Sequence, residues 1–212
     1  MALGKLLVFE GGDGIGKSFL ATQLTTYLRD QGLATLQLSF PGKREGSLGN
    51  LVYSLHHAPE RYGVLSITPL GLQALHIAAH LDEIATIIRP EINKGTWIVL
   101  DRYWWSTWVY GLAAGADRDC LELLISAERR AGDDVQPTAV IVVERETALR
   151  EEHSQVTFET LRSLYRLISE RESSSQPTHI LDNNDLERSK AALFSIAEGI
   201  IYQKTSESEH PR

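Results

Sequence analysis

The sequence has very little cysteine and no long apolar run. Its 212 residues include one cysteine, Cys120, which excludes an intrachain disulfide and a zinc site built on cysteines. A membrane-spanning helix needs about 20 consecutive apolar residues, and we expect no such span. The first apolar run begins close to Met1, so we also expect no signal peptide. A reducing cytoplasm is the compartment that these features predict.

Positive charge is also scarce. The chain has 21 lysine and arginine residues against 28 aspartate and glutamate residues, which gives a formal net charge of −7. Binding along a nucleic-acid polymer needs a basic surface, so we exclude that class of protein. A single nucleotide remains possible as a ligand, because its phosphates need only local positive potential. The length and the hydrophobic content of 42% suit one α/β domain.

Glycine, in contrast, is concentrated near the start of the chain. An apolar run over 5–10, expected to be a buried strand, leads into Gly-Gly-Asp-Gly-Ile-Gly-Lys-Ser over 11–18. A segment with helical periodicity follows from residue 19. This is the phosphate-binding P-loop pattern. The glycines permit positive φ, so that successive N–H groups surround a phosphate, and the following helix adds the positive end of its dipole.

The motif predicts a nucleotide site with bound magnesium. Lys17 would reach the β- and γ-phosphates of ATP, and the Ser18 hydroxyl would contact Mg²⁺. The expected cofactor-binding residues are Gly11, Gly14, Ile15, Gly16, Lys17, Ser18 and Phe19. The structural alternative is a chance glycine-rich turn, but the predicted order of strand, loop and helix favours the P-loop.

The rest of the chain alternates between expected strands and expected helices. Further strands are expected over 33–40, 97–101, 138–143 and 179–182, and helices over 47–55, 68–89, 121–130, 146–168 and 186–201. This alternation predicts a five-stranded parallel sheet between two helix layers, an α/β/α architecture. Ligands of such sheets bind at the carboxyl ends of the strands, which gathers the P-loop, 40–44 and 101–103 on one rim.

Four segments together resemble the thymidylate kinase family. They are Phe9 to Ser18, Phe40-Pro41-Gly42, Asp101-Arg102-Tyr103 followed by Ser106, Thr107 and Tyr110, and Phe158 to Tyr165. The resemblance covers nearly the whole chain, and Asp-Arg-Tyr after a P-loop is a fairly specific part of it. It implies a P-loop NTPase fold, with a single kinase domain over 1–204, a short lid over about 144–155 and a polar tail over 205–212.

The resemblance also implies an activity and its residues. The chain would be a homodimeric, ATP- and Mg²⁺-dependent phosphotransferase that converts dTMP to dTDP. Asp13 would hold the 3′-hydroxyl of the acceptor, Arg102 would contact its phosphate, and Asp101 would assist the magnesium ion. Ser106 and Thr107 would lie against the base, and Tyr110 would crowd the 2′ position. Phe40, Arg44 and Ile77 complete the expected substrate-binding residues.

Two parts of the chain depart from the family pattern. The family's long helix carries an aromatic residue that stacks on the base and, four residues later, an arginine that hydrogen-bonds it. The corresponding positions here look like Ile77 and Leu81, which puts the thymine specificity in question. The lid is short and its acidic residues outnumber its two arginines, Arg145 and Arg150. We expect Arg150 to be the catalytic arginine of this segment.

Three functions therefore stay open at this point. The first is a dTMP kinase, the second is a kinase of another deoxynucleotide or of a nucleoside, and the third is a catalytically degenerate nucleotide-binding regulator. Intact Lys17, Asp101 and Arg102 favour an enzyme, while the short lid and the changed base site favour a regulator. Asp101 and Arg102 also have a plain structural alternative, a surface ion pair, and Asp13 has one as a turn residue. For His56, His57, His76 and His80, packed or exposed histidines are favoured over metal ligands.

Overall fold

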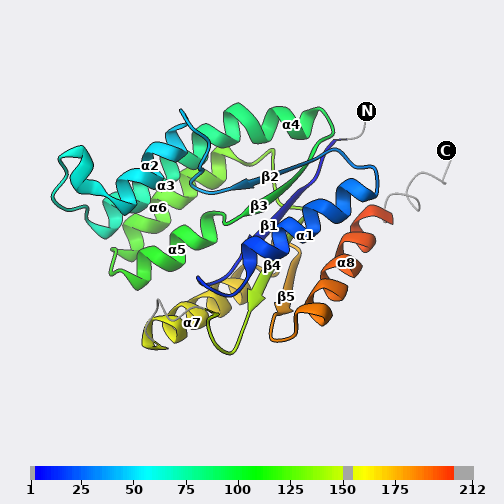
Figure 1. Cartoon of the computed structure of the whole chain (residues 1–212). Helices are drawn as coiled ribbons and strands as arrows, with labels where there is room; N and C mark the ends of the chain where they lie inside the picture. Colours follow the sequence, from blue (N-terminus) through cyan, green and yellow to red (C-terminus); the bar gives the residue numbers. More distant parts are fainter. Residues whose placement is uncertain (1–2, 150–154, 203–212) are drawn as a thin grey trace.

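A five-stranded parallel sheet forms the centre of the molecule (Figure 1). The computed structural model describes residues 3–149 and 155–202, without the side chains of 155–157. The strands are β1 (Leu6–Glu10), β2 (Thr35–Ser39), β3 (Trp97–Asp101), β4 (Ala139–Glu144) and β5 (Thr178–Asp182). Their order in the sheet is β2-β3-β1-β4-β5, and every neighbouring pair is parallel. The predicted α/β fold with five parallel strands is confirmed.

The helices cover both faces of this sheet. They are α1 (Lys17–Asp30), α2 (Leu48–His57), the 3₁₀ turn η1 (Pro59–Tyr62), α3 (Pro69–Glu83), the π-helical turn η2 (Ile84–Ile88), α4 (Arg89–Asn93), α5 (Trp104–Ala113), α6 (Arg118–Ala131), α7 (Gln155–Glu172) and α8 (Leu186–Tyr202). Among these described helices, none is long and apolar enough to cross a membrane.

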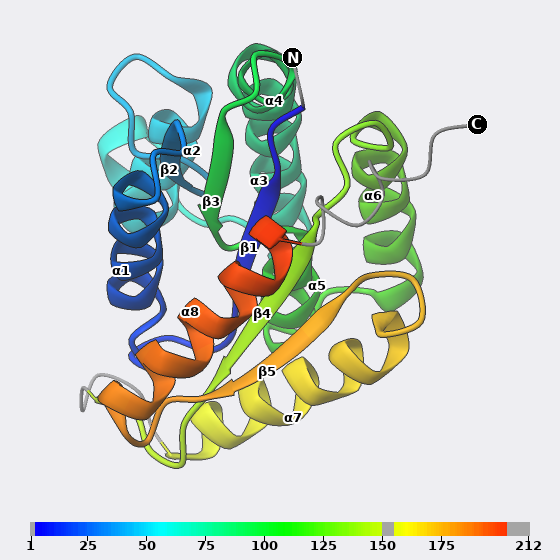
Figure 2. The same ribbon diagram turned by 90° about the vertical axis from the view of Figure 1, so that its right-hand side faces the viewer.

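Two separate hydrophobic cores follow from the alternation of strand side chains. In β1, Leu6 and Val8 pack into the core that includes residues of α3, α5, α6 and α7. Leu7 and Phe9 point to the other face and pack with residues of α1 and α8. Successive side chains of a strand face opposite ways, so a strand buried on both faces is apolar at nearly every position. Figure 2 shows α1 and α8 together on one side of the sheet.

Side-chain caps begin two of the helices that build the site. The hydroxyl of Ser47 accepts a hydrogen bond from the backbone of Asn50 at the start of α2. Thr68 caps α3 in the same way, with Pro69 as the first helical residue. Both caps satisfy N–H groups that the helix leaves without partners. The helix starts predicted at these two residues are confirmed.

The long helix predicted over 68–89 is interrupted near its end. After α3, one π-helical turn spans Ile84–Ile88 and α4 begins at Arg89. Pro90 has no N–H to donate to the carbonyl of Thr86, and its ring would clash with that carbonyl in a regular α-helix. The wider turn before the proline avoids this clash. The perturbation predicted at Arg89-Pro90 is confirmed.

The helix predicted over 146–168 is wrong at its start, because α7 begins only at Gln155. The segment 145–149 is irregular and binds the neighbouring loops instead. Leu149 N–H donates to Gly14 O of the P-loop at 2.7 Å, and Glu146 N–H donates to the side chain of Asn184 at 3.1 Å. These backbone groups are therefore used between segments rather than within a helix. Residues 150–154 of the expected lid lie outside the described part of the chain.

Gly49 lets α2 approach the loop after β2, and this contact predicts a difference between two glycines. A Cβ at Gly49 would lie 1.9 Å from Pro41 O, whereas a Cβ at Gly199 in α8 would meet no atom of the described residues within 4 Å. We expect Gly49→Ala to lower the free energy of unfolding by about 1–3 kcal/mol through overpacking. Gly199→Ala should raise it by roughly 0.5–1 kcal/mol through helix propensity. Urea unfolding of both variants measures this, and equal effects would contradict the packing described here.

Candidate active site

A cavity of about 830 Å³ lies at the carboxyl ends of β1, β2 and β3. Its walls come from the P-loop, from the loop that follows β2, from α2 and α3, and from the start of α5. This is the position at which open parallel α/β sheets bind their ligands. The edge of the sheet at which the sequence predicts ligand binding therefore borders one continuous cavity.

The P-loop forms one end of this cavity. Gly14 and Gly16 adopt φ of 69° and 92°, conformations that glycine adopts without strain. Lys17 is the first residue of α1, and its buried ammonium group donates a hydrogen bond to Gly12 O. Burial, followed by repulsion from Arg102, lowers the pKa of Lys17 to about 7. A phosphate bound beside this ammonium group would favour its charged form again.

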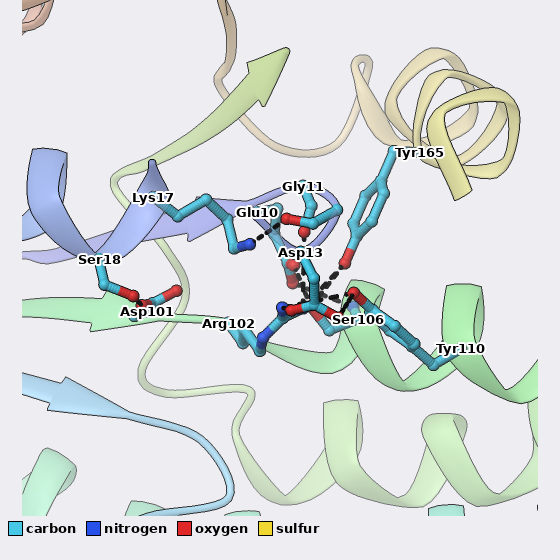
Figure 3. Close-up of polar contacts among 11 residues, drawn as sticks. Glu10, Gly11, Asp13, Lys17, Ser18, Asp101, Arg102, Ser106, Tyr110 and Tyr165 are labelled. Carbon is cyan, nitrogen blue, oxygen red and sulfur yellow. Dashed lines mark hydrogen bonds and ion pairs between the residues drawn. The ribbon is translucent and has the colours of Figure 1, made fainter. Parts of the chain in front are cut away.

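Ser18 and Asp101 meet beside the P-loop, as Figure 3 shows. The Ser18 hydroxyl donates to Asp101 Oδ2 at 2.5 Å. The other carboxylate oxygen, Asp101 Oδ1, is buried and has no hydrogen-bond partner among the described residues. A buried carboxylate oxygen without a donor is costly, and oxygen ligands of this kind suit a hard cation. The chemistry of these two residues therefore fits a hard divalent cation such as Mg²⁺.

Glu10 ties the end of β1 to the start of α5. Its fully buried carboxylate accepts hydrogen bonds from Tyr103 N at 2.9 Å, from Ser106 N at 3.2 Å and from Ser106 Oγ at 2.5 Å. Burial raises the pKa of Glu10 to about 7, although Ser106 and the charge of Arg102 act in the opposite direction. The carboxylate thus fixes the backbone that directly follows β3.

Arg102 lies at the centre of the polar contacts in Figure 3. Its φ of 74° falls in the left-handed region, which a residue with a side chain rarely adopts. The guanidinium group pairs with Asp13 and donates to Ser106 Oγ at 3.2 Å and to the Tyr165 hydroxyl at 3.4 Å. It also lies over the ring of Tyr110, 5.0 Å from the ring centre. Hydrogen-bond acceptors and an aromatic ring on several sides hold this cation in one orientation at the cavity.

Asp13 joins the same group of side chains. Besides its ion pair with Arg102, it accepts a hydrogen bond of 2.6 Å from the Tyr110 hydroxyl. Asp101 is bonded to Ser18 instead of Arg102. Asp101 and Arg102 therefore do not form the isolated surface ion pair that was the structural alternative.

The structure brings most of the predicted site residues to this cavity. The lining includes Asp13, Gly14, Ile15, Gly16, Lys17, Ser18, Phe19, Phe40, Asp101, Arg102, Ser106, Thr107 and Tyr110. Gly11 does not line it. This residue packs behind the P-loop, where a Cβ would lie 2.5 Å from Val143 O, and it borders a smaller cavity beside Arg162.

Two other predicted residues are not at the cavity wall, and a third lies outside the described part of the chain. Arg44 is turned toward Glu83 of α3, at 3.6 Å, and is 56% exposed, while its neighbour Lys43 lines the cavity. Ile77, which we expected to bind the base, is buried in the hydrophobic core and does not line the cavity. Arg150 lies outside the described residues.

The cavity face of α3 carries Gln73, His76 and His80 instead. These positions are three and four residues apart, which places them on one side of a helix. Ile77 is one position further along and therefore turned by about 100° toward the core. The base-facing positions predicted at Ile77 and Leu81 thus lie one residue along the helix from the histidines that line the cavity. The spacing of His76 and His80 was the available signal for the correct face.

Glu10 and Tyr165 are further site residues that the sequence analysis did not assign. Tyr165 reaches the site from α7, where its hydroxyl lies 2.8 Å from Ser106 Oγ. A charged residue at the end of an otherwise apolar strand was a signal for Glu10. The segment Phe158 to Tyr165 is part of the family resemblance, but it gave Tyr165 no role, because the contact of Tyr165 depends on how α7 packs against the sheet.

The fold and the P-loop define a member of the P-loop α/β class of proteins. Within this class, the sequence matches the model of the thymidylate kinase family over residues 9–180. It is 31% identical over 188 residues to the thymidylate kinase of Afipia carboxidovorans, covering 78% of this chain and 77% of that relative. For the thymidylate kinase of Synechococcus sp. (strain CC9902), the identity is 34% over 159 residues, covering 72% and 73%. The chain belongs to the thymidylate kinase family.

Other comparisons cover different shares of the chain. The match to the thymidylate kinase of Chlorobium luteolum is 32% identical over 124 residues, covering 57% of this chain and 54% of that relative. Several curated relatives are thus matched over only about half of their length. The crystal structure of thymidylate kinase from Ehrlichia chaffeensis superposes with a TM-score of 0.74 at 17% identity, covering 92% of this chain and 98% of that one. That likeness concerns the fold alone.

The raised pKa of Glu10 predicts a pH dependence of stability. Between pH 4.5 and about 7 the folded state holds a proton that the unfolded state has lost, so folding becomes more favourable as the pH falls through this window. Glu10→Gln removes this contribution, on the order of 3 kcal/mol over the whole window. We expect the difference in unfolding free energy between wild type and variant to change with pH accordingly. Urea unfolding at several pH values tests this.

Glu45→Gln is the matched control for that experiment, because Glu45 is exposed in the loop after β2. This variant measures the effect of removing one carboxylate from an exposed position at each pH. A difference for Glu10→Gln with the same pH dependence as that of Glu45→Gln would show that Glu10 titrates near its ordinary pKa.

Proposed function

We propose that the chain transfers the γ-phosphoryl group of ATP to the 5′-phosphate of dTMP, forming ADP and dTDP. One observation carries the proposal: a single cavity joins the P-loop to the oriented Arg102–Asp13 pair. A phosphate donor and a phosphate acceptor can therefore lie in the same space. Membership of the thymidylate kinase family supports this choice of reaction.

The P-loop would bind the phosphates of the donor. Residues Gly14 to Ser18 present backbone N–H groups at the start of α1, where the positive end of the helix dipole lies. The Lys17 ammonium group is already at this point and would move from Gly12 O to phosphate oxygens. Replacing the neutral carbonyl of Gly12 by an anionic phosphate would favour the charged form of Lys17.

Ser18 and Asp101 would hold the magnesium ion. When bound, Mg²⁺ neutralises charge that develops on the transferred phosphoryl group. In this chain, Asp101 accepts the hydrogen bond of Ser18 with one oxygen and leaves the other oxygen available. Glu10 does not compete for the ion, because its carboxylate is bonded to Tyr103 and Ser106.

Arg102 would bind the acceptor phosphate. A planar guanidinium group holds phosphate oxygens in a fixed orientation, and Tyr110, Ser106 and Asp13 already restrict its position. Asp13 would receive the 3′-hydroxyl of the sugar, and Tyr110 would crowd a 2′-hydroxyl. The attacking oxygen is already anionic, so that alignment and nearby cations are the main requirements of the reaction.

Arg150 remains our candidate for a lid arginine at the transferred group. Arg145 donates to Asn183 O, so it is engaged by the loop after β5. Family resemblance also leads us to propose a homodimer, which sedimentation velocity would test.

The decisive test is ADP formation from ATP and Mg²⁺, with dTMP beside dUMP, dCMP, dGMP, dAMP and thymidine as acceptors. We expect turnover with dTMP, and its loss in Lys17→Ala, which removes the buried ammonium group. Binding of ATP without ADP formation for any acceptor would refute the kinase and leave the nucleotide-binding regulator. Turnover with thymidine alone would indicate a nucleoside kinase.

Arg102→Lys separates the roles of charge and geometry. The lysine keeps the positive charge but loses the planar fork that binds two oxygens. We expect kcat/KM for dTMP to fall by about 10- to 100-fold. The KM for ATP should change little, because the P-loop contacts stay intact. Steady-state kinetics with each substrate varied in turn gives both values, and an effect on ATP alone would contradict the assignment.

A further inference from the structure

Four histidines form the wall of the cavity on α2 and α3. His56 and His57 come from α2, and His76 and His80 come from α3. The two helices run side by side in Figure 1, and their residues are in contact. Phe40 and Gln73 line the same region. The proposed phosphate chemistry uses none of these imidazoles.

The rings form a continuous aromatic surface. The ring centres of His56 and His76 are 5.2 Å apart, and those of His76 and His80 are 6.3 Å apart. His80 stacks on Phe40 with 4.0 Å between centres and 13° between planes. Aromatic walls with polar edges suit a flat, partly polar ligand such as a nucleobase.

His80 is held in one orientation. Its Nδ1 lies 2.9 Å from Glu128 Oε1, and the two side chains are 2% and 0% exposed. A buried carboxylate requires a donor, so Nδ1 carries the hydrogen of this bond. Among the described residues, Nε2 on the other edge of the ring has no hydrogen-bond partner. That nitrogen accepts a hydrogen bond when the ring is neutral and donates one when the ring is protonated.

His76 and Gln73 can also either donate or accept a hydrogen bond. His76 Nε2 is 3.3 Å from His56 Nδ1. Burial and the neighbouring His80 and His56 lower the pKa of His76 to about 3, so that its ring is neutral near pH 7. A neutral imidazole has one N–H and one lone pair, and the amide of Gln73 has both donors and an acceptor. Each of these groups can thus meet a carbonyl or an amino group.

We propose that Gln73, His76 and His80 read the base of the acceptor nucleotide, and that this pocket takes the 4-amino pyrimidine of dCMP as well as the 4-oxo pyrimidine of dTMP. The inference rests on the proposed function in assuming a nucleoside monophosphate as the acceptor. A 4-oxo group needs a donor, and a 4-amino group needs an acceptor. The imidazole and amide groups supply either one, whereas an arginine in their place would supply donors alone.

Equilibrium binding tests this inference separately from turnover. Isothermal titration with dTMP and with dCMP gives the dissociation constant of each nucleotide for the wild-type chain. We expect the two constants to agree within about tenfold, as sites without a one-sided hydrogen-bond requirement discriminate weakly. A preference for dTMP of about 100-fold or more, or no binding of either nucleotide, would overturn the inference.

Substitutions at His80 test whether this residue must be able to accept as well as donate a hydrogen bond. Arginine at this position can stack on Phe40 and pair with Glu128, but it cannot accept a hydrogen bond. We expect His80→Arg to shift the preference toward dTMP by about tenfold or more. His80→Gln keeps both a donor and an acceptor and should leave the ratio near that of wild type. Equal ratios for arginine and glutamine would contradict the proposed role.

A second pair of variants covers the case in which the buried His80 site does not tolerate arginine. His76→Phe keeps an aromatic ring and removes both nitrogens, so we expect weaker binding of both nucleotides, by about 3- to 10-fold. His179→Phe is the matched control, because His179 lies on β5 and does not line the cavity. An equal effect of the two substitutions would refute a contact between His76 and the base.

The two proposals fail in different ways. If dTMP and dCMP bind as expected but no ADP forms, the kinase is refuted and the base pocket stands. If ADP forms with dTMP while dCMP binds about 100-fold more weakly, the kinase stands and the ambivalent pocket is refuted.

Discussion

The buried carboxylate of Glu10 is the interaction on which the site depends. At the end of β1 it accepts hydrogen bonds from Tyr103 N, just before α5, and from Ser106 N in the first turn of that helix. Arg102 lies between β3 and α5, so this bond fixes the backbone on which the arginine stands. The same strand continues into the P-loop. One buried group therefore sets the distance between the phosphate-binding loop and the arginine that faces it.

Much of the fold and part of the site could be predicted from local signals. The apolar strands, the caps at Ser47 and Thr68, and the P-loop glycines each act within a few residues of the chain. The face of α3 could not be settled in this way, because a shift of one residue turns a side chain by about 100°. In the structure His76 lines the cavity and Ile77 lies in the core, and a shift of one residue would reverse these two positions. The start of α7 depends on contacts of 145–149 with distant loops, which no local pattern shows.

Two kinds of side chain line different parts of the cavity. Near the P-loop, Lys17, Asp101 and Arg102 are buried or partly buried charges, and their strength comes from exclusion of water. On α3, His76 and Gln73 are neutral groups that can adapt their hydrogen bonds to a ligand. We propose that the first set supplies the phosphoryl transfer and the second set the choice of base. Changes in one set can then alter rate or specificity separately.

A crystal structure with dTMP and a non-hydrolysable ATP analogue would test this account most directly. It predicts donor phosphates against Gly14 to Ser18, the acceptor phosphate on Arg102, and the base between Phe40 and the His76 edge. The 3′-hydroxyl should lie at Asp13. An acceptor nucleotide bound outside the cavity, or with its base on the P-loop side and its phosphate among the histidines, would contradict the account.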